Sequence, residues 1–430
     1  MRNILTSAAV LALAGVSSAE PLAFPGAMGF GANATGGRGG DVVHVTNLDD
    51  DGPGSFRDAI GQPNRTVVFD VGGVINAAKQ FVVSDNVTIA GQTAPGGISV
   101  FGTGISMSGK KNIILRYMTF RSGIASGRGS KSLNIYNGQN IIVDHCSIGW
   151  GRWDNVGITA KQAEPTFDVT LQNCLIHEAI KDQQFGMIVD NVRQVSLVRN
   201  LWINNRARNP KGKGDIQYIN NVIYNWGNQG YGGGHSGAPW KQDLIGNYFI
   251  AGPDSTGGFF TFANANDLVH SRGNFVDTDK DGTLNGRAWT EADLTKPDAK
   301  TGEFATPTTN PSNASPVAVE ILPAEAAVKA VIVEAGNSLH RDAVDLRQIE
   351  HLQSYGKLGK NPQNEAEVGG MPAPTTGPAA PADSDGDGMP DEYETKNGLN
   401  PNDAGDGKAL AADGYTRLEL YLNSLVAGRV

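Results

Sequence analysis

The chain has 430 residues, a formal net charge of −9 and 56 glycines. This length allows one large domain with an appendage, and the acidic balance argues against nucleic acid as a partner. The glycine content, together with frequent Pro, Asn and Asp, is typical of many short strands joined by turns.

The N-terminus is predicted to be a secretion signal. Met1-Arg2-Asn3 precedes an apolar run that ends near Val16, and Ser17-Ser-Ala19 supplies the small residues that signal peptidase accepts. The apolar run is too short to span a membrane. We therefore expect residues 1–19 to be a signal peptide, the mature protein to be extracellular and no membrane to be a partner. Sequons at Asn33, Asn64, Asn86 and Asn313 allow glycosylation in a eukaryotic host.

A strand repeat occupies the middle of the chain. Aligned apolar strands place one column of residues at a spacing of 21 to 28 positions: Gln92, Met118, Cys146, Cys174, Asn200, Asn221, Asn247 and Asn274. A period in the twenties indicates a coiled parallel sheet, along which stacked asparagines hydrogen-bond to one another. We predict an all-β fold, a right-handed parallel β-helix, whose long exposed face suits an extended polymer.

The two cysteines, Cys146 and Cys174, are neighbours in this column. Rungs of a β-helix lie about 4.8 Å apart, which is within the range that a disulfide permits. Parallel side chains in register make the disulfide dihedral angle awkward, however. A bridge and two buried thiols both remain open.

The organisation along the chain follows from this repeat. Residues 20–300 are predicted to form the β-helix domain, which begins with an entry cap and a short helix at Ser55–Ile60. Residues 301–370 are expected to pack on the outside of the solenoid, with one long helix over Ala324–Tyr355. Residues 371–382 form a proline-rich linker, and residues 383–430 form a small calcium-binding module.

Two segments have the oxygen-ligand spacing of calcium loops. The loop 277–288 offers Asp277, Asp279, Asp281, Thr283 and Asn285, but its twelfth position is Ala288, so it is incomplete. The second loop offers Asp383, Asp385, Asp387 and, at its twelfth position, Glu394. An Asp-rich surface turn is the alternative for either. We expect calcium as a cofactor, and a structural role for both loops.

A basic turn lies between the Asn200 and Asn221 rungs. The segment Arg206-Ala-Arg208-Asn-Pro-Lys211-Gly-Lys213 places four cations within eight residues. On charge alone, a binding patch and a solvated basic loop are equally consistent with it.

This turn and other segments resemble the pectate lyases of polysaccharide lyase family one. Arg208-Asn-Pro-Lys-Gly-Lys213 is similar to the family's Arg-x-Pro-x-x-Arg motif, and Ile142-Val-Asp-His-Cys-Ser147 is similar to its Trp-Ile-Asp-His segment. The opening Ala23-Phe-Pro-Gly-Ala-Met-Gly-Phe and Asp50-Asp-Gly-Pro-Gly-Ser-Phe also look like the family. The resemblance covers nearly the whole mature chain and is strongest with the fungal secreted type that carries an EF-hand-like loop.

The resemblance implies β-elimination of polygalacturonate, with pectate or pectin as the polymer bound; we expect a monomer. It assigns proton abstraction at C5 to Arg208, and the binding of substrate carboxylates to Lys181 and Lys213. A free guanidinium is a poor base, because its pKa exceeds ~12. Arg208 therefore either sits where the neutral form is favoured or mainly stabilises the developing enediolate.

Two departures from the family pattern concern the calcium that it places between enzyme and substrate. An aspartate usual in the strand written here as Ser132-Leu-Asn-Ile135 is absent, and Asp154 alone remains of an acidic pair. Asp154 stays a candidate metal ligand, and Arg152 is a candidate for binding substrate in place of the metal's charge. A calcium-independent pectin lyase, another uronate lyase and a non-catalytic polysaccharide-binding β-helix all remain open.

Overall fold

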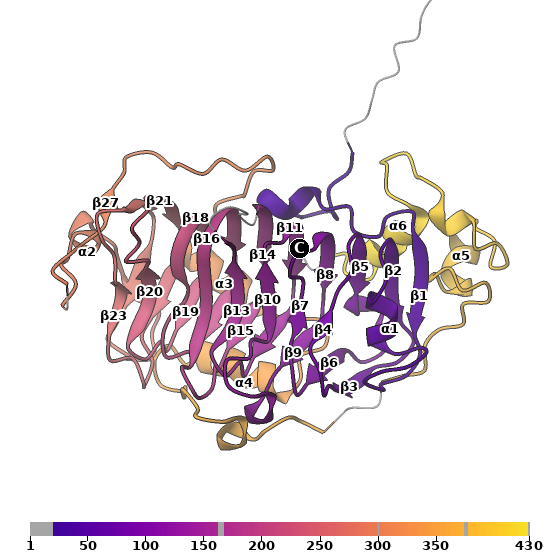
Figure 1. The fold of residues 1–430 in the computed structure, drawn as a ribbon, viewed down its shortest axis with the longest axis horizontal. Helices are drawn as coiled ribbons and strands as arrows, with labels where there is room; N and C mark the ends of the chain where they lie inside the picture. The colour runs from indigo at the N-terminus through magenta and orange to yellow at the C-terminus, as the bar shows by residue number, and fades with distance from the viewer. Residues whose placement is uncertain (1–19, 162–166, 300, 374–376, 429–430) are drawn as a thin grey trace, which may run out of the picture.

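The computed structural model describes residues 20–161, 167–299, 301–373 and 377–428. The predicted signal peptide, residues 1–19, lies outside this part of the chain. Successive short strands stack in parallel along one axis, so the chain forms a β-helix that runs from β1 at one end to β24 and β27 at the other (Figure 1). The predicted all-β parallel β-helix is confirmed.

The first stack of strands contains the aligned repeat. It consists of β1 (Asp41–Val45), β2 (Arg65–Phe69), β5 (Val87–Ala90), β8 (Lys111–Arg116), β11 (Gln139–Asp144), β14 (Phe167–Gln172), the second halves of β16 (Phe185–Val198) and β18 (Lys211–Ile219), β21 (Trp240–Ile245), β24 (Asp267–Arg272) and β27 (Thr306–Pro307). Val87 pairs with Ile113, and the register continues through Ile141, Val169, Val195, Ile216 and Gln242. The predicted alignment of the repeats is therefore the observed register.

Two further stacks complete each coil. The second stack consists of β4 (Phe81–Val82), β7 (Ile105–Ser106), β10 (Leu133–Tyr136), β13 (Asp154–Thr159), the first halves of β16 and β18, β20 (Gln229–Gly233) and β23 (Gly258–Thr261). The third is a separate sheet of β3 (Gly73–Asn76), β6 (Ile98–Phe101), β9 (Thr119–Arg121), β12 (Ser147–Gly149), β15 (Leu175–His177), β17 (Leu201–Ile203), β19 (Val222–Tyr224), β22 (Tyr248–Ile250), β25 (Phe275–Asp277) and the antiparallel β26 (Arg287–Ala288).

The asparagine column forms a buried hydrogen-bonded ladder. Oδ1 of Asn221 accepts from the backbone N and Nδ2 of Asn200, each at 3.0 Å. Asn221 in turn donates from Nδ2 to Oδ1 of Asn247, and Asn247 donates to Oδ1 of Asn274 at 2.8 Å. The ladder satisfies backbone groups at a corner of the coil where the strands cannot. Above it in the column, Cys146 and Cys174 are free, buried thiols.

Helices cover the outside of the solenoid. α1 (Phe56–Ile60), with Ser55 as its N-cap, lies in the entry region as expected. α3 (Ala324–Glu334) and α4 (Ala343–Gln353) pack on the outer face of the third sheet, where Val328, Val331 and Leu352 are fully buried. A short α2 (Glu291–Leu294) precedes them, at the end of the solenoid opposite β1.

The prediction of one long helix over Ala324–Tyr355 is wrong, because α3 and α4 are separate. The chain leaves the helical conformation at Ala335, and Gly336 has a φ of 80°, which favours glycine. A Cβ at Gly336 would lie only 2.6 Å from Oγ of Ser147 on the solenoid. Asp342 then starts α4 by accepting hydrogen bonds from the backbone N of Val344 and Asp345.

The last segment returns to the first rungs. α5 (Asp391–Asn397) and α6 (Arg417–Ser424) lie beside β1 and β2 in Figure 1. Met389 and Leu418 pack against Val68, and Nε of Arg38 bonds Oε1 of Glu419 at 2.8 Å. Within the described residues, no helix combines the length and apolar character that crossing a bilayer requires.

Candidate active site

The outer face of the second stack carries the predicted catalytic turn. One register row of this stack faces the core and consists of Ile135, Ile158, Val189 and Gly212. Because neighbouring residues of a strand point to opposite faces, the rows on either side point outward. One outward row contains Asn134, Gly157, Ile188 and Lys211; the other contains Tyr136, Thr159, Asp190 and Lys213.

Arg208 is held firmly on this face. It lies in the turn between β17 and β18, and its guanidinium carbon sits 3.8 Å from the ring centroid of Phe185. Nη1 of Arg208 donates to Oδ1 of Asp154 at 3.0 Å, and its backbone N donates to Gln229. The stacking and the charged hydrogen bond fix the guanidinium plane, while 17% of the Arg208 side chain remains exposed.

Asp154 is the buried carboxylate beside this arginine. It begins β13 and pairs in register with Phe185, which in turn pairs with Ala207 of the catalytic turn, so Asp154 lies two rungs from that turn. Burial raises its pKa, and the charges of Arg208, Lys131 and Lys211 act in the opposite direction. Asp154 therefore orients Arg208 and is itself closed off from solvent, with an exposed fraction of 1%.

Three lysines add positive charge to this part of the molecule. Lys213, a predicted substrate-binding residue, bonds Oδ1 of Asp190 at 2.9 Å. Burial lowers the pKa of Lys211, and the charges of Arg208 and Lys213 lower it further. Lys131, in the turn before β10, is close enough to Asp154 to stabilise its charged form.

Lys181 and Arg152 lie together in neighbouring loops. Lys181 follows β15 and its side chain is exposed. Nε of Arg152 donates to the backbone O of Lys181 at 3.3 Å, and its Nη2 donates to Asp182. The structure thus joins Arg208 to Asp154 by a hydrogen bond, places Lys213 in an outward row of the second stack, and pairs Arg152 with Asp182 in the neighbouring loop.

Sequence reasoning missed Phe185, Asp190 and Lys131 as members of this site, and it noted Lys211 only as one cation of the basic turn. The outward register of Lys211 was available from its spacing of two from Lys213, since residues i and i+2 of a strand share a face. Nothing in the sequence around Lys131 indicates that its turn lies one rung away from Asp154.

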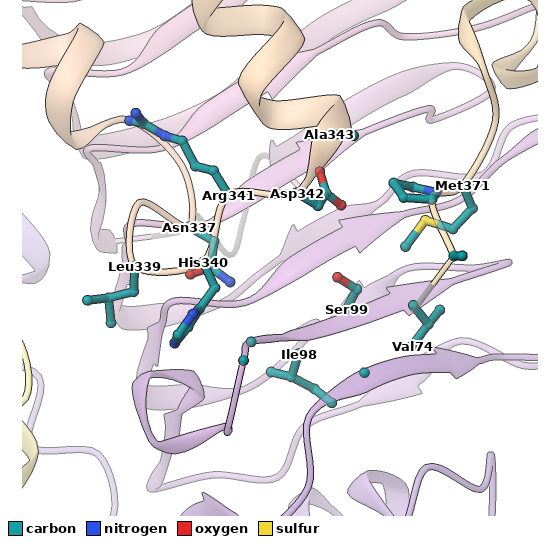
Figure 2. Close-up of a pocket in the computed structure, with 15 residues that line it drawn as sticks. Val74, Ile98, Ser99, Asn337, Leu339, His340, Arg341, Asp342, Ala343 and Met371 are labelled. Atoms are coloured by element: carbon teal, nitrogen blue, oxygen red, sulfur yellow. The ribbon is translucent and has the colours of Figure 1, made fainter. Parts of the chain in front are cut away.

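A cavity of about 550 Å³ lies elsewhere, on the third sheet. It is bounded by β3, β6 and the segments 337–343 and 371–373, and Figure 2 shows His340, Asp342 and Met371 around it. Asp342 accepts from Nη2 of Arg121 at 3.0 Å and caps α4. Its charge thus serves the attachment of α4, and the cavity has no connection with Arg208.

The second predicted calcium loop forms a compact carboxylate cluster. Asp383, Asp385 and Asp387 approach one another within 4.8 Å, as do Asp387, Glu394 and Asp406. Glu394 is fully buried, and neither of its carboxylate oxygens has a hydrogen-bond partner. Burial, with repulsion from the neighbouring aspartates, raises the pKa of Glu394 to about 7 and that of Asp387 to about 6. Buried, unpartnered oxygens that repel one another fit a hard divalent cation.

Asp406 is a member of this cluster that the loop pattern missed. It lies twelve positions after Glu394, beyond the twelve-residue loop, and the turn at Asn400–Asp406 brings it back. One of its oxygens is also buried without a partner.

In the first predicted calcium loop, which lies within the described residues, no three acidic ligand atoms approach one another within 4.8 Å. Its side chains bond within the loop: Asp277 accepts from the backbone N of Asn285, Asp281 accepts from that of Thr283, and the Asn285 amide donates to Asp281. Asp279 likewise accepts from the backbone of Asp281. Calcium binding by Asp277, Asp279, Asp281, Thr283 and Asn285 stays a prediction.

These observations define the class of protein: a parallel β-helix whose long outer face carries cationic side chains. No protein-family model matches the chain. The probable pectate lyase C of Aspergillus flavus is 43% identical over 415 residues, covering 94% of each chain. The probable pectate lyase C of Aspergillus fumigatus is 42% identical over 426 residues, covering 98% of each chain. The chain belongs to the pectate lyase family.

Solved structures of the same fold are more distant in sequence. The major allergen of cedar pollen superposes with a TM-score of 0.55 at 18% identity, covering 72% of this chain and 92% of that one. A thermostable pectate lyase superposes with a TM-score of 0.53 at 14% identity, covering 73% and 98%. These two likenesses support the β-helix fold.

Proposed function

We propose that the protein is a secreted pectate lyase that cleaves (1→4)-α-D-galacturonan by β-elimination and releases unsaturated oligogalacturonides. The observation that carries this proposal is the fixed guanidinium of Arg208 on an outer sheet face that also presents Lys211 and Lys213. A linear polyanion can lie along this face, because the stacked rungs repeat at about 4.8 Å, close to the length of one sugar.

The chemistry breaks two bonds and makes one double bond. The C5 proton, acidified by the adjacent carboxylate, passes to a base, and its electron pair forms the C4=C5 double bond. The C4–O bond breaks, and the departing oxygen takes a proton. Arg208 acts at C5, either as the group that accepts the proton or as the donor that stabilises the enediolate.

The surrounding residues position the polymer. Phe185 and Asp154 orient Arg208, while Lys213 and Lys181 bind substrate carboxylates as point charges. Lys213 replaces the second arginine of the family motif, so it keeps the charge and loses the two-pronged geometry. Arg152, tied to Asp182, lines the adjoining loop and binds substrate at the rim.

Calcium belongs to the C-terminal module in this proposal. Asp383, Asp385, Asp387, Glu394 and Asp406 would hold the ion, which would neutralise their mutual repulsion and supply no chemistry to the groove. The module contacts the first rungs through Met389 and Leu418. Calcium there stabilises the attachment of the module to the N-terminal end of the solenoid.

The test is to incubate the mature protein with polygalacturonate and, separately, with highly methylated pectin. We expect ultraviolet-absorbing unsaturated ends to appear from polygalacturonate and to be few from methylated pectin, since lysine charges pair with free carboxylates. A preference for methylated pectin would favour the pectin lyase alternative. Failure to cleave either polymer, with tight binding retained, would favour the non-catalytic β-helix.

A further inference from the structure

The outer face around Arg208 is rich in cations, although the family resemblance implies a bound metal ion there. Arg208 bonds the single buried carboxylate of Asp154, and the charges of Lys131 and Lys211 also act to lower the pKa of that carboxyl. Asp190, the other acid on this face, is paired with Lys213 at 2.9 Å.

A divalent cation does not fit these residues. Calcium prefers several carboxylate and carbonyl oxygens, whereas Asp154 is a single carboxylate, 1% exposed, whose Oδ1 already bonds Arg208. Within the described residues (20–161, 167–299, 301–373 and 377–428), only two groups of three or more Asp, Glu, His or Cys side chains bring their ligand atoms within 4.8 Å of one another. Both lie in the C-terminal module: Asp383, Asp385 and Asp387, and Asp387, Glu394 and Asp406. Lys131 and Lys211 would also repel a divalent cation placed beside them.

A glycine makes room for one of these lysines. A Cβ at Gly157 would lie 2.8 Å from Cδ and 2.9 Å from Cε of Lys131, and 2.9 Å from Oδ1 of Asn134. The aliphatic stem of Lys131 therefore lies across the sheet at Gly157, where any other residue would displace it. Gly157 and Lys211 occupy the same outward row, two rungs apart, with Ile188 between them.

A second lysine side chain passes over a glycine further along the same outer face. A Cβ at Gly234 would lie 2.5 Å from Cγ of Lys213. The aliphatic stems of Lys131 and Lys213 thus both pass over a glycine, and the ammonium group of Lys213 is held by Asp190. Fixed, half-buried ammonium groups interact more strongly with an anion than mobile exposed ones, because less water screens them.

We propose that Lys131 and Lys211 bind the uronate carboxylate next to the bond that breaks, where the family resemblance implies calcium, so that turnover needs no divalent cation. This inference rests on the proposed β-elimination. When the C5 proton leaves, negative charge spreads onto that carboxylate, and the two ammonium groups stabilise it. A methyl ester carries no charge for them to pair with, so the same two lysines select unesterified galacturonate.

The experiment measures initial rates on soluble oligogalacturonates with excess chelator or with added calcium, at a temperature where circular dichroism shows the full chain folded in both. We expect the two rates to agree within about twofold, because the charge at the carboxylate comes from the protein. Abolition of turnover by chelator in folded protein, with recovery on adding calcium, would overturn this inference and leave the lyase activity intact. Absence of turnover in both media, on pectate and on pectin, would instead remove the proposed function.

Substitutions on this face test which residues supply the positive charge. Lys131→Gln and Lys211→Gln should each reduce kcat/KM in chelator by ~10- to 10²-fold, with part of the loss in KM, and calcium should not restore it. Gly157→Ala, which displaces the Lys131 stem, should resemble Lys131→Gln. Lys241→Gln, at an exposed position of β21, is the matched control and should leave both constants unchanged. Normal kcat/KM in both Lys131→Gln and Lys211→Gln, with their circular dichroism unchanged, would refute the proposed role of these two lysines.

Discussion

Arg208 and Asp154 form the pair on which the proposed chemistry depends. The resemblance of the basic turn predicted Arg208, and the structure supplies what the turn alone lacks: a carboxylate at 3.0 Å and an aromatic ring at 3.8 Å that fix the guanidinium. Neither partner is near in sequence, since Asp154 is on β13 and Phe185 on β16. Contacts between rungs depend on register, which a local motif does not contain.

Removal of the Asp154 charge should uncouple this pair. We expect Asp154→Asn to keep the fold and to reduce kcat on polygalacturonate by ~10- to 10²-fold, because the guanidinium loses its charged hydrogen bond and its fixed orientation. Steady-state kinetics with a thermal melt as control would measure this. An Asp154→Asn protein with normal kcat would show that Arg208 needs no orienting carboxylate.

At the scale of elements, the strand stack was predictable and the helical attachments were not. Strand register follows from the column that ends at Asn274, because its members, asparagines in the last four rungs, recur at the same place in each coil. The break between α3 and α4 depends on Gly336 approaching Ser147 from a distant part of the chain. Such a contact leaves no periodic signal.

A buried acid attaches α4 to the solenoid. Glu178 accepts from Nη2 of Arg347 at 2.8 Å and from Nε1 of Trp150 at 3.1 Å. Burial alone would raise the pKa of Glu178, yet the adjacent His177 and Arg347 lower it from 4.5 to about 2. A lowered carboxylate pKa adds stability above the unfolded-state value, and this stability is lost as pH falls from about 4.5 toward about 2.

Glu178→Gln should therefore destabilise the protein by about 3 kcal/mol at neutral pH, since it leaves Arg347 without its partner. The difference in stability from the unmodified protein should shrink as pH is lowered through that window. Chemical denaturation at a series of pH values would measure it. A difference that stays constant from pH ~7 to ~3 would exclude this ionic role.

At the scale of the whole molecule, the C-terminal module packs against the first rungs of the β-helix. The sequence predicted a calcium module there, and the structure adds Asp406 to its carboxylates and places its apolar side against Val68. Where the module docks was not predictable, because its few apolar residues match many surfaces. Its acids repel one another without a cation, so its stability should depend on calcium.

Calcium should raise the melting temperature of the intact protein, and chelator should lower it. Binding to the folded state alone contributes about 2.7 kcal/mol when calcium is at ~100 times its Kd. We expect Glu394→Gln to abolish most of this difference without changing kcat at temperatures below the melt. Glu392→Gln, an exposed neighbour on α5, is the control. Equal calcium dependence in both variants would place the ion elsewhere.

In the proposed mechanism Arg208 drives β-elimination of pectate, and the rate at which Arg208→Lys forms unsaturated ends is the decisive measurement. Arg193→Lys, an exposed position on β16, is the matched control. We expect Arg208→Lys to stay folded, to keep most of its affinity for polygalacturonate and to lose at least ~10²-fold in turnover. Near-normal turnover by a folded Arg208→Lys protein would contradict it.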